Sequence, residues 1–328
     1  MNRYFPIDSA KIVMAIMIVS LHSMPLFHDA DVDQYVGWGF DLIVPLFFCF
    51  SGFFYGANTD LKKSLRHLIP LYLFYAVLSW PLSFIVFEGL TLWQALHKAL
   101  FFGTFNIGWF IVSLAWCMII IFYLDKLRNR ALRYGLMTAS ALLCYVVCMS
   151  MISYSSVITG SVIGKMQRIS ADLISVPQWS FMRGLLFFTI GFFFNRFAIR
   201  IPRYAAFAML LMALTAYFAE LTLTNRAGIT VTSINCSIPF VIFAGMATIL
   251  SYCRPTDDHG LGKEFRRAST MLYLSHPMIM FLLYGATGIN GGLPRLVITL
   301  AVFAVLFATY QRLRKLQKPY LHWLKYAC

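Results

Sequence analysis

The first apolar segment contains three titratable side chains. Two of them, Lys11 and His22, have the types and the spacing for acid–base chemistry. The stretch IDSAKIVMAIMIVSLHSMPLF places Asp8 and Lys11 near its start and His22 deep within it. On a helix, Lys11 and His22 lie about 16 Å apart along the axis and almost on one face. Because the unperturbed pKa of an imidazole is near neutral, His22 is predicted to act as a general base. The alternative is a histidine that is hydrogen-bonded between helices for packing.

A second histidine lies in the stretch STMLYLSHPMIMFLL. His276 is followed by Pro277, which removes one backbone donor and leaves a carbonyl free nearby. Tyr273 lies one turn before His276 and shares its face. Because titratable groups at membrane depth are costly and usually functional, this pair is a second candidate site. A structural histidine beside a kink is the alternative.

The stretch VPLFFCFSGFF combines a long apolar run with a proline and a small polar pair. Pro45 predicts a kink, because its ring disrupts helical hydrogen bonding. Ser51 and Gly52 offer a hydroxyl donor and a close approach to a neighbouring helix. We expect this segment to pack beside the first one and to leave a polar cleft next to His22. Asp41 comes just before the stretch and needs a partner if it lies at membrane depth.

Three further features have a packing or surface interpretation by default. Gly184 and Gly191 are seven residues apart and are predicted to line one helix seam. Glu220 is predicted to be either interfacial or an acid within the membrane. The stretch 254–268 is predicted to be a charged, solvated connector.

The elements that must position these residues are transmembrane helices. The chain has 328 residues, of which 60% are hydrophobic and 12% charged, whereas soluble domains have about 45–50% apolar and roughly 25% charged residues. A span needs about 20 apolar residues. The sequence predicts one all-α membrane domain over 1–328, with about ten spans near 10–28, 36–56, 67–87, 107–124, 131–152, 180–194, 202–222, 233–251, 269–289 and 293–310.

The distribution of lysine and arginine predicts the orientation of these spans. The net charge of +14 is compatible with nucleic-acid binding or with cytoplasmic loops rich in basic residues. Roughly 21 of the 27 basic residues fall at one set of span ends and about 6 at the other. This alternation favours the second explanation. It predicts that both termini are cytoplasmic and that no nucleic acid is bound.

The seven cysteines do not have the spacing of a metal site or a disulfide framework. Their number is odd, no CxxC pair occurs, and most lie inside apolar runs. Buried, inert thiols are therefore expected. No metal is predicted.

Several ordered motifs resemble the acyltransferase-3 family of integral membrane O-acyltransferases. Asp8, Lys11 and His22 are similar to the family's opening Asp-x-x-(Arg/Lys)…His, and VPLFFCFSGFF resembles its Val-Pro signature. The segments GWFIVSL, FFTIGFFF and LYLSHPMI are similar to three later family segments. The motifs cover the chain from residue 8 to residue 280, and its length resembles that of the compact O-acetyltransferases.

The resemblance implies acyl transfer from acetyl-CoA to a hydroxyl of a surface glycan or a lipid-linked sugar. His22 is then the predicted base, and Lys11 is predicted to hold a donor phosphate or to influence the pKa of His22. His276, Tyr273 and Ser51 are predicted to orient groups or to stabilise an oxyanion. The cytoplasmic residues Lys62, Lys63 and Arg66 are predicted to attract the acidic coenzyme.

Two positions depart from the family pattern. Many members have an arginine shortly before the Val-Pro signature, where Asp41 stands here, and Lys11 occupies a position that is commonly arginine. Arginine binds phosphate through two parallel hydrogen bonds, whereas lysine acts as a point charge. These differences point to altered handling of the donor or to a different substrate class.

Two other classes of protein share the same general features. A sugar or lipid transporter, or a flippase, has similar spans and buried titratable groups, but it is expected to show repeats or paired charges along a path. A non-catalytic membrane partner has histidines that serve only in packing. Replacement of His22 separates an enzyme from such a partner, and labelled acetyl-CoA separates an enzyme from a transporter.

Overall fold

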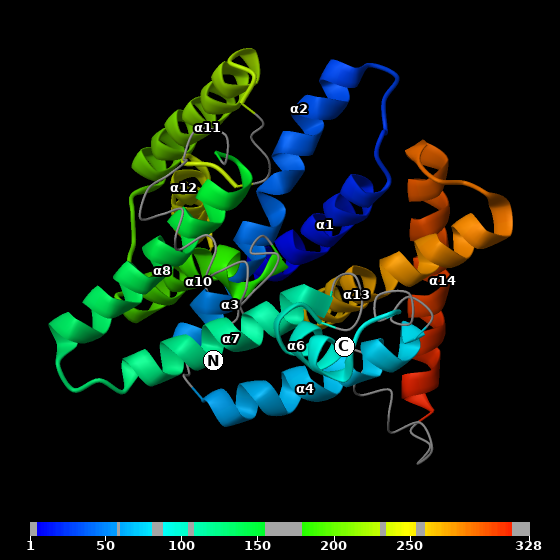
Figure 1. Cartoon of the computed structure of the whole chain (residues 1–328), viewed down its shortest axis with the longest axis horizontal. Coiled ribbons are helices and arrows are strands. Elements are labelled where there is room, and N and C mark those ends of the chain that lie inside the picture. Colours follow the sequence, from blue (N-terminus) through cyan, green and yellow to red (C-terminus); the bar gives the residue numbers. More distant parts are fainter. Residues whose placement is uncertain are drawn as a thin grey trace.

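The computed structural model describes residues 5–57, 60–80, 88–103, 108–154, 179–229, 234–253 and 260–316. This part of the chain is helical and contains no strand. Its helices are α1 (Phe5–His22), α2 (Ala30–Asp41), α3 (Ile43–Ala57), α4 (Leu61–Leu78), α6 (Leu92–Phe101), α7 (Gly108–Asp125), α8 (Arg130–Ile152), α10 (Phe181–Arg196), α11 (Arg203–Arg226), α12 (Ile238–Tyr252), α13 (Leu261–Thr287) and α14 (Gly292–Lys315) (Figure 1).

The predicted all-α class is confirmed, and each of the ten predicted spans overlaps a helix. Within the described residues, six helical segments are long and apolar enough to cross a membrane: α1, α2 with α3, α7, α8, α11 and α14. The others differ for physical reasons. Helices α10 and α12 have 16 and 15 residues, while α4 and α13 begin with basic turns. The count of ten crossings and the cytoplasmic position of both termini remain predictions.

Pro45 lies in the first turn of a helix, whereas the sequence placed it within one span, 36–56, and predicted a kink there. Helix α2 ends at Asp41, Leu42 caps it, and α3 begins at Ile43. Proline is tolerated in the first turn of a helix, where its missing N–H has no helical acceptor. The predicted disruption is therefore confirmed as a break between two helices, and it sets the direction in which α3 enters the core.

Glycines allow α3 and α10 to approach closely. A Cβ atom on Gly52 would lie 1.9 Å from the carbonyl oxygen of Phe188, and one on Gly191 would lie 1.8 Å from that of Cys49. A Cβ atom on Gly184 would collide with the ring of Phe48 at 2.5 Å. The predicted seam of Gly184 and Gly191 is confirmed. The expectation that Gly52 approaches the first span is wrong, because its neighbour is α10.

Helices α1 and α13 form a second packed pair. Asp8 of α1 pairs with Arg266 near the start of α13, and His22 at the end of α1 lies beside His276. The two helices therefore run in the same direction. Helix α14 packs along α13 and α1 at the side of the molecule away from α11 (Figure 1).

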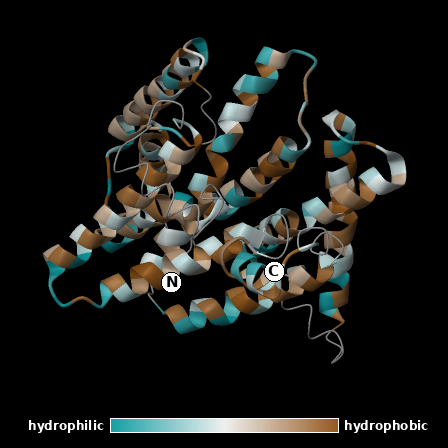
Figure 2. Ribbon diagram, viewed as in Figure 1, coloured by the Kyte–Doolittle hydropathy of each residue, from teal (hydrophilic) through white to brown (hydrophobic). Residues whose placement is uncertain are grey.

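Hydrophobic residues occur along nearly all of the helices, as Figure 2 shows. Hydrophilic residues gather at helix ends and at turns such as the one between α7 and α8. Charged and polar side chains in the interior are thus exceptions, and their positions identify the candidate site.

Candidate functional site

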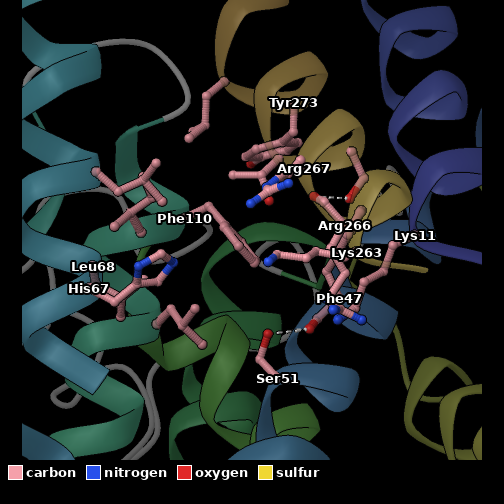
Figure 3. Close-up of a pocket in the computed structure, with 16 residues that line it drawn as sticks. Lys11, Phe47, Ser51, His67, Leu68, Phe110, Lys263, Arg266, Arg267 and Tyr273 are labelled. Atoms are coloured by element: carbon pink, nitrogen blue, oxygen red, sulfur yellow. Dashed lines mark hydrogen bonds between the residues drawn. The ribbon is translucent and has the colours of Figure 1, made fainter. Parts of the chain in front are cut away.

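Two cavities lie at opposite ends of the α1–α13 pair. The first cavity has a volume of about 500 Å³ and lies among α1, α3, α4, α7 and α13 (Figure 3). Its basic residues are Lys11, His67, Lys263, Arg266 and Arg267. No acidic side chain is among the described residues that line it. The first cavity is therefore suited to an anionic ligand.

Two carboxylates behind the first cavity orient its arginines. The carboxylate of Asp8 is buried and pairs with Arg266. Glu264 accepts a hydrogen bond from Arg267 at 2.6 Å and one from Arg314 of α14 at 3.1 Å. These pairs hold the guanidinium groups at the wall and neutralise part of their charge.

The two lysines of the first cavity have a different environment. The Nζ atom of Lys11 lies 4.5 Å from the centre of the Phe54 ring, a cation–π contact. Lys263 is exposed near the start of α13. Neither lysine has a carboxylate within ion-pair distance among the described residues. Their charges remain available to a ligand.

An aromatic wall closes the inner end of the first cavity. The rings of Phe47, Phe110 and Tyr273 pack with centroid separations of 5.4 to 6.1 Å. Ser51 is on the same wall, and its Oγ donates a hydrogen bond to the carbonyl of Phe47 at 2.8 Å. This local bond satisfies the hydroxyl within its own helix, so Ser51 must rotate before it can donate to a ligand.

The second cavity, of about 350 Å³, lies at the other end of α1 and α13. Its polar lining consists of His22, His276, Tyr284, Asn290 and Arg295, and its apolar lining comes from α13. The ring centroids of His22 and His276 are 5.2 Å apart. His22 is exposed at the cavity, whereas His276 is completely buried.

The hydrogen bond of His276 determines which of its nitrogens is free. Its Nδ1 lies 3.2 Å from the carbonyl oxygen of Leu272. Since a carbonyl only accepts, this bond requires the proton on Nδ1 and leaves a lone pair on Nε2. The Nε2 atom is buried and has no hydrogen-bond partner within the structure. His276 is thus oriented as an acceptor beside His22.

Backbone contacts hold the second cavity together. The N–H of Gly292, at the start of α14, donates to the carbonyl of Ser23 at 2.7 Å. The carboxylate of Asp33 accepts the N–H groups of Leu26 and Phe27 at 2.9 and 3.0 Å. These bonds tie the segment after His22 to both α2 and α14.

Both cavities have lining residues on α13. Tyr273 lines the first cavity and His276 lines the second. Their rings lie one helical turn apart, with centroids 6.2 Å from each other. A group that reaches Tyr273 from the basic side therefore comes close to the histidine pair.

The structure brings together most, but not all, of the predicted site residues. Lys11, Ser51 and Tyr273 line the first cavity, and His22 with His276 lines the second. Lys11 and His22 thus share a helix but line different cavities. The predicted coenzyme-binding residues of α4 are Lys62, Lys63 and Arg66, which are exposed on its first two turns. They line neither cavity.

Sequence reasoning missed several basic residues of the site: His67, Lys263, Arg266, Arg267 and Arg295. Three of these were assigned to a solvated connector, but residues 261–268 form the first turns of α13; residues 254–259 lie outside the described part. The run KEFRRA contains strong helix formers and was the available signal.

Two half-buried acids outside the cavities have structural partners. Asp41 interacts electrostatically with the buried Arg183 of α10. Glu220 accepts hydrogen bonds from Tyr154, from the N–H of Cys236 at 2.9 Å and from Ser237. Burial and the bond to Glu220 hold the pKa of Tyr154 well above its usual range, so this phenol remains a donor. Glu220 thereby joins α8, α11 and the start of α12.

Comparisons with known proteins give one match. A family model described as an acyltransferase domain matches residues 6–310. The matched region includes both cavities and nearly the whole chain. No curated protein and no solved structure matches the chain. Among the described residues, no group of three or more His, Cys, Asp or Glu side chains is placed to hold a metal ion.

Proposed function

The chain belongs to the acyltransferase-3 family, and from this premise we propose that it transfers an acetyl group from acetyl-CoA to a hydroxyl of a glycan or a lipid-linked sugar at the bacterial inner membrane. The observation that carries the proposal is the junction on α13. A basic cavity and a cavity with two histidines share α13 as a wall, on which Tyr273 of the first and His276 of the second lie one turn apart.

The first cavity is proposed to hold the donor. Coenzyme A is rich in phosphate, and arginine and lysine side chains are the usual partners of phosphate groups. Arg266 and Arg267 are oriented by Asp8 and Glu264, while Lys11 and Lys263 add positive charge, with no carboxylate within ion-pair distance of either among the described residues. The acetyl end of the donor then points toward the aromatic wall and the histidine pair.

The second cavity is proposed to hold the acceptor. Its hydroxyl oxygen attacks the thioester carbonyl carbon, so that a C–O bond forms and the C–S bond breaks. His22 takes the hydroxyl proton and delivers it to the departing thiolate of coenzyme A. His276, whose Nε2 carries the lone pair, lies beside His22 and is proposed to stabilise the protonated ring. Tyr273 is the candidate donor to the developing oxyanion.

Radiolabelled acetyl-CoA tests this function. The purified protein, reconstituted in lipid nanodiscs, is incubated with the labelled donor and a panel of sugars and polyprenyl-linked sugars. We expect acceptor-dependent release of coenzyme A together with a labelled acceptor. Labelled sugar that crosses the bilayer of a vesicle without modification would instead indicate a transporter, and no labelled product across the panel would overturn the proposal.

A further inference from the structure

Arg295 gives the second cavity a positive charge for which the transfer reaction itself has no use. We propose that this cavity selects an acceptor with an acidic group, a carboxylate or a phosphate, and that Arg295 binds that group. This inference rests on the proposed function, because it specifies the class of the acceptor.

The lining of the second cavity leaves the charge of Arg295 without a counter-ion. None of the eight described residues that line it is acidic, and its other titratable groups are the two histidines and Tyr284. Among the described residues, Arg295 has one hydrogen-bond partner, the backbone carbonyl of Asn290, and its buried Nε atom has none. A guanidinium that keeps unsatisfied donors at a cavity wall is suited to a planar anion.

The position of Arg295 on its helix adds to this positive potential. Arg295 lies in the first turn of α14, which begins at Gly292. A cation at this end of a helix is unfavourable, because the exposed N–H groups and the macrodipole are already positive there. An anion bound to Arg295 would offset this unfavourable effect.

The distance between the acidic group and the reacting hydroxyl is set by the backbone. The bond from Gly292 to Ser23 fixes the start of α14 against the residue that follows His22. Arg295 and His22 therefore face one cavity from two joined elements. An acceptor held by its acidic group at Arg295 presents a hydroxyl on the same molecule to the histidines. Neutral sugars lack this second point of attachment.

Paired acceptors test the inference. The full-length protein in nanodiscs is assayed with labelled acetyl-CoA and with methyl glucoside, glucuronic acid or glucose 1-phosphate. We expect kcat/KM to be about tenfold or more higher for an acidic acceptor than for the neutral one. Arg295→Gln should abolish this preference, and Arg295→Lys should keep part of it. The control is Arg226→Gln, which removes the same charge from the exposed end of α11 and should leave the preference intact.

The possible results separate this inference from the proposed function. Equal use of neutral and acidic acceptors, or a preference that survives in Arg295→Gln, overturns the acidic-acceptor inference while the transferase function stands. The comparison of glucuronic acid with glucose 1-phosphate identifies the acidic group. Thermal stabilisation by these two compounds is measured in parallel without donor. Stabilisation that depends on Arg295 without any transfer supports the anion site and counts against the transferase, whereas neither stabilisation nor transfer overturns both.

Discussion

The α3–α10 pair and the α1–α13 pair are both tightly packed, but they differ in what lies between the helices. Between α3 and α10, glycines bring the backbones into direct contact. Between α1 and α13, polar side chains meet at each end, Asp8 with Arg266 and His22 with His276. The α3–α10 pair therefore serves in packing, whereas the α1–α13 pair carries polar side chains that line two cavities. Substitutions in the two pairs should therefore affect different measurements.

The largest expected effect is on folding, at the glycine seam. Gly191→Ala places a methyl group 1.8 Å from the carbonyl oxygen of Cys49, and backbone atoms cannot give way as a side-chain tip can. We expect destabilisation of about 3 kcal/mol or more and a loss of most folded protein. The measurements are the yield of monodisperse protein in detergent and the midpoint of thermal unfolding.

A matched glycine provides the control for this substitution. Gly245 is also within a helix, but a Cβ atom there would meet nothing within 4 Å. Gly245→Ala should therefore express like the natural protein, because alanine favours a helix. Equal yields from the two variants would show that α3 and α10 are not in backbone contact.

The next effect is on catalysis, at the histidine pair. His22→Ala should lower the rate of acetyl transfer by about 10²- to 10⁴-fold, the usual contribution of a general base. The unfolding midpoint should change little, because His22 is exposed at its cavity. His276→Asn retains a donor for the carbonyl of Leu272 and removes the Nε2 lone pair, so it should also reduce transfer without loss of protein.

These variants directly contrast the two helix pairs. If His22→Ala lowers the amount of folded protein as Gly191→Ala does, then His22 is a packing residue and the α1–α13 pair also serves in packing. Transfer at the natural rate in His22→Ala would assign the base to another residue.

The sequence was sufficient to predict the helices and to single out both histidines as candidate site residues. Long apolar runs predict the helical segments, because the thickness of the bilayer sets the length of such runs. His22 and His276 stood out because titratable groups are rare within apolar runs. Their juxtaposition across 254 positions of the chain was not predictable from spacing, because it depends on how α1 packs against α13.

The charged part of the site was harder to predict for a physical reason. Basic residues near a span end have the same sequence pattern whether they anchor a loop or line a cavity. Lys62 and Lys263 are both exposed lysines in the first turn of a helix, yet only Lys263 lines a cavity. Likewise, Gly52 predicts a close approach to a helix but does not identify which one.

A smaller effect is expected at the ion pair of α1 and α13. Arg266→Gln leaves the buried carboxylate of Asp8 unpaired, whereas the natural arginine side chain is 32% exposed. We expect destabilisation of about 2 kcal/mol, below the range for fully buried pairs because of this exposure. The double variant Asp8→Asn with Arg266→Gln should recover part of the loss. A double-mutant cycle of thermal unfolding measures the coupling, and additive losses would mean that the pair does not join the helices.

The smallest effect distinguishes the two exposed lysines. Lys263→Gln should raise the KM for the donor about three- to tenfold with little change in kcat, because one exposed charge at a cavity is worth roughly 1 kcal/mol. Lys62→Gln removes the same charge outside the cavity and should leave KM unchanged. The difference in KM should shrink as salt rises, since the Debye length falls from about 10 Å at 0.1 M to about 3 Å at 1 M.

If the two variants raise KM equally, the donor is attracted by the general basic character of this surface and not by the cavity. In that case the original prediction for Lys62, Lys63 and Arg66 would be the better one, and the position of the lysine on α13 would have no special role.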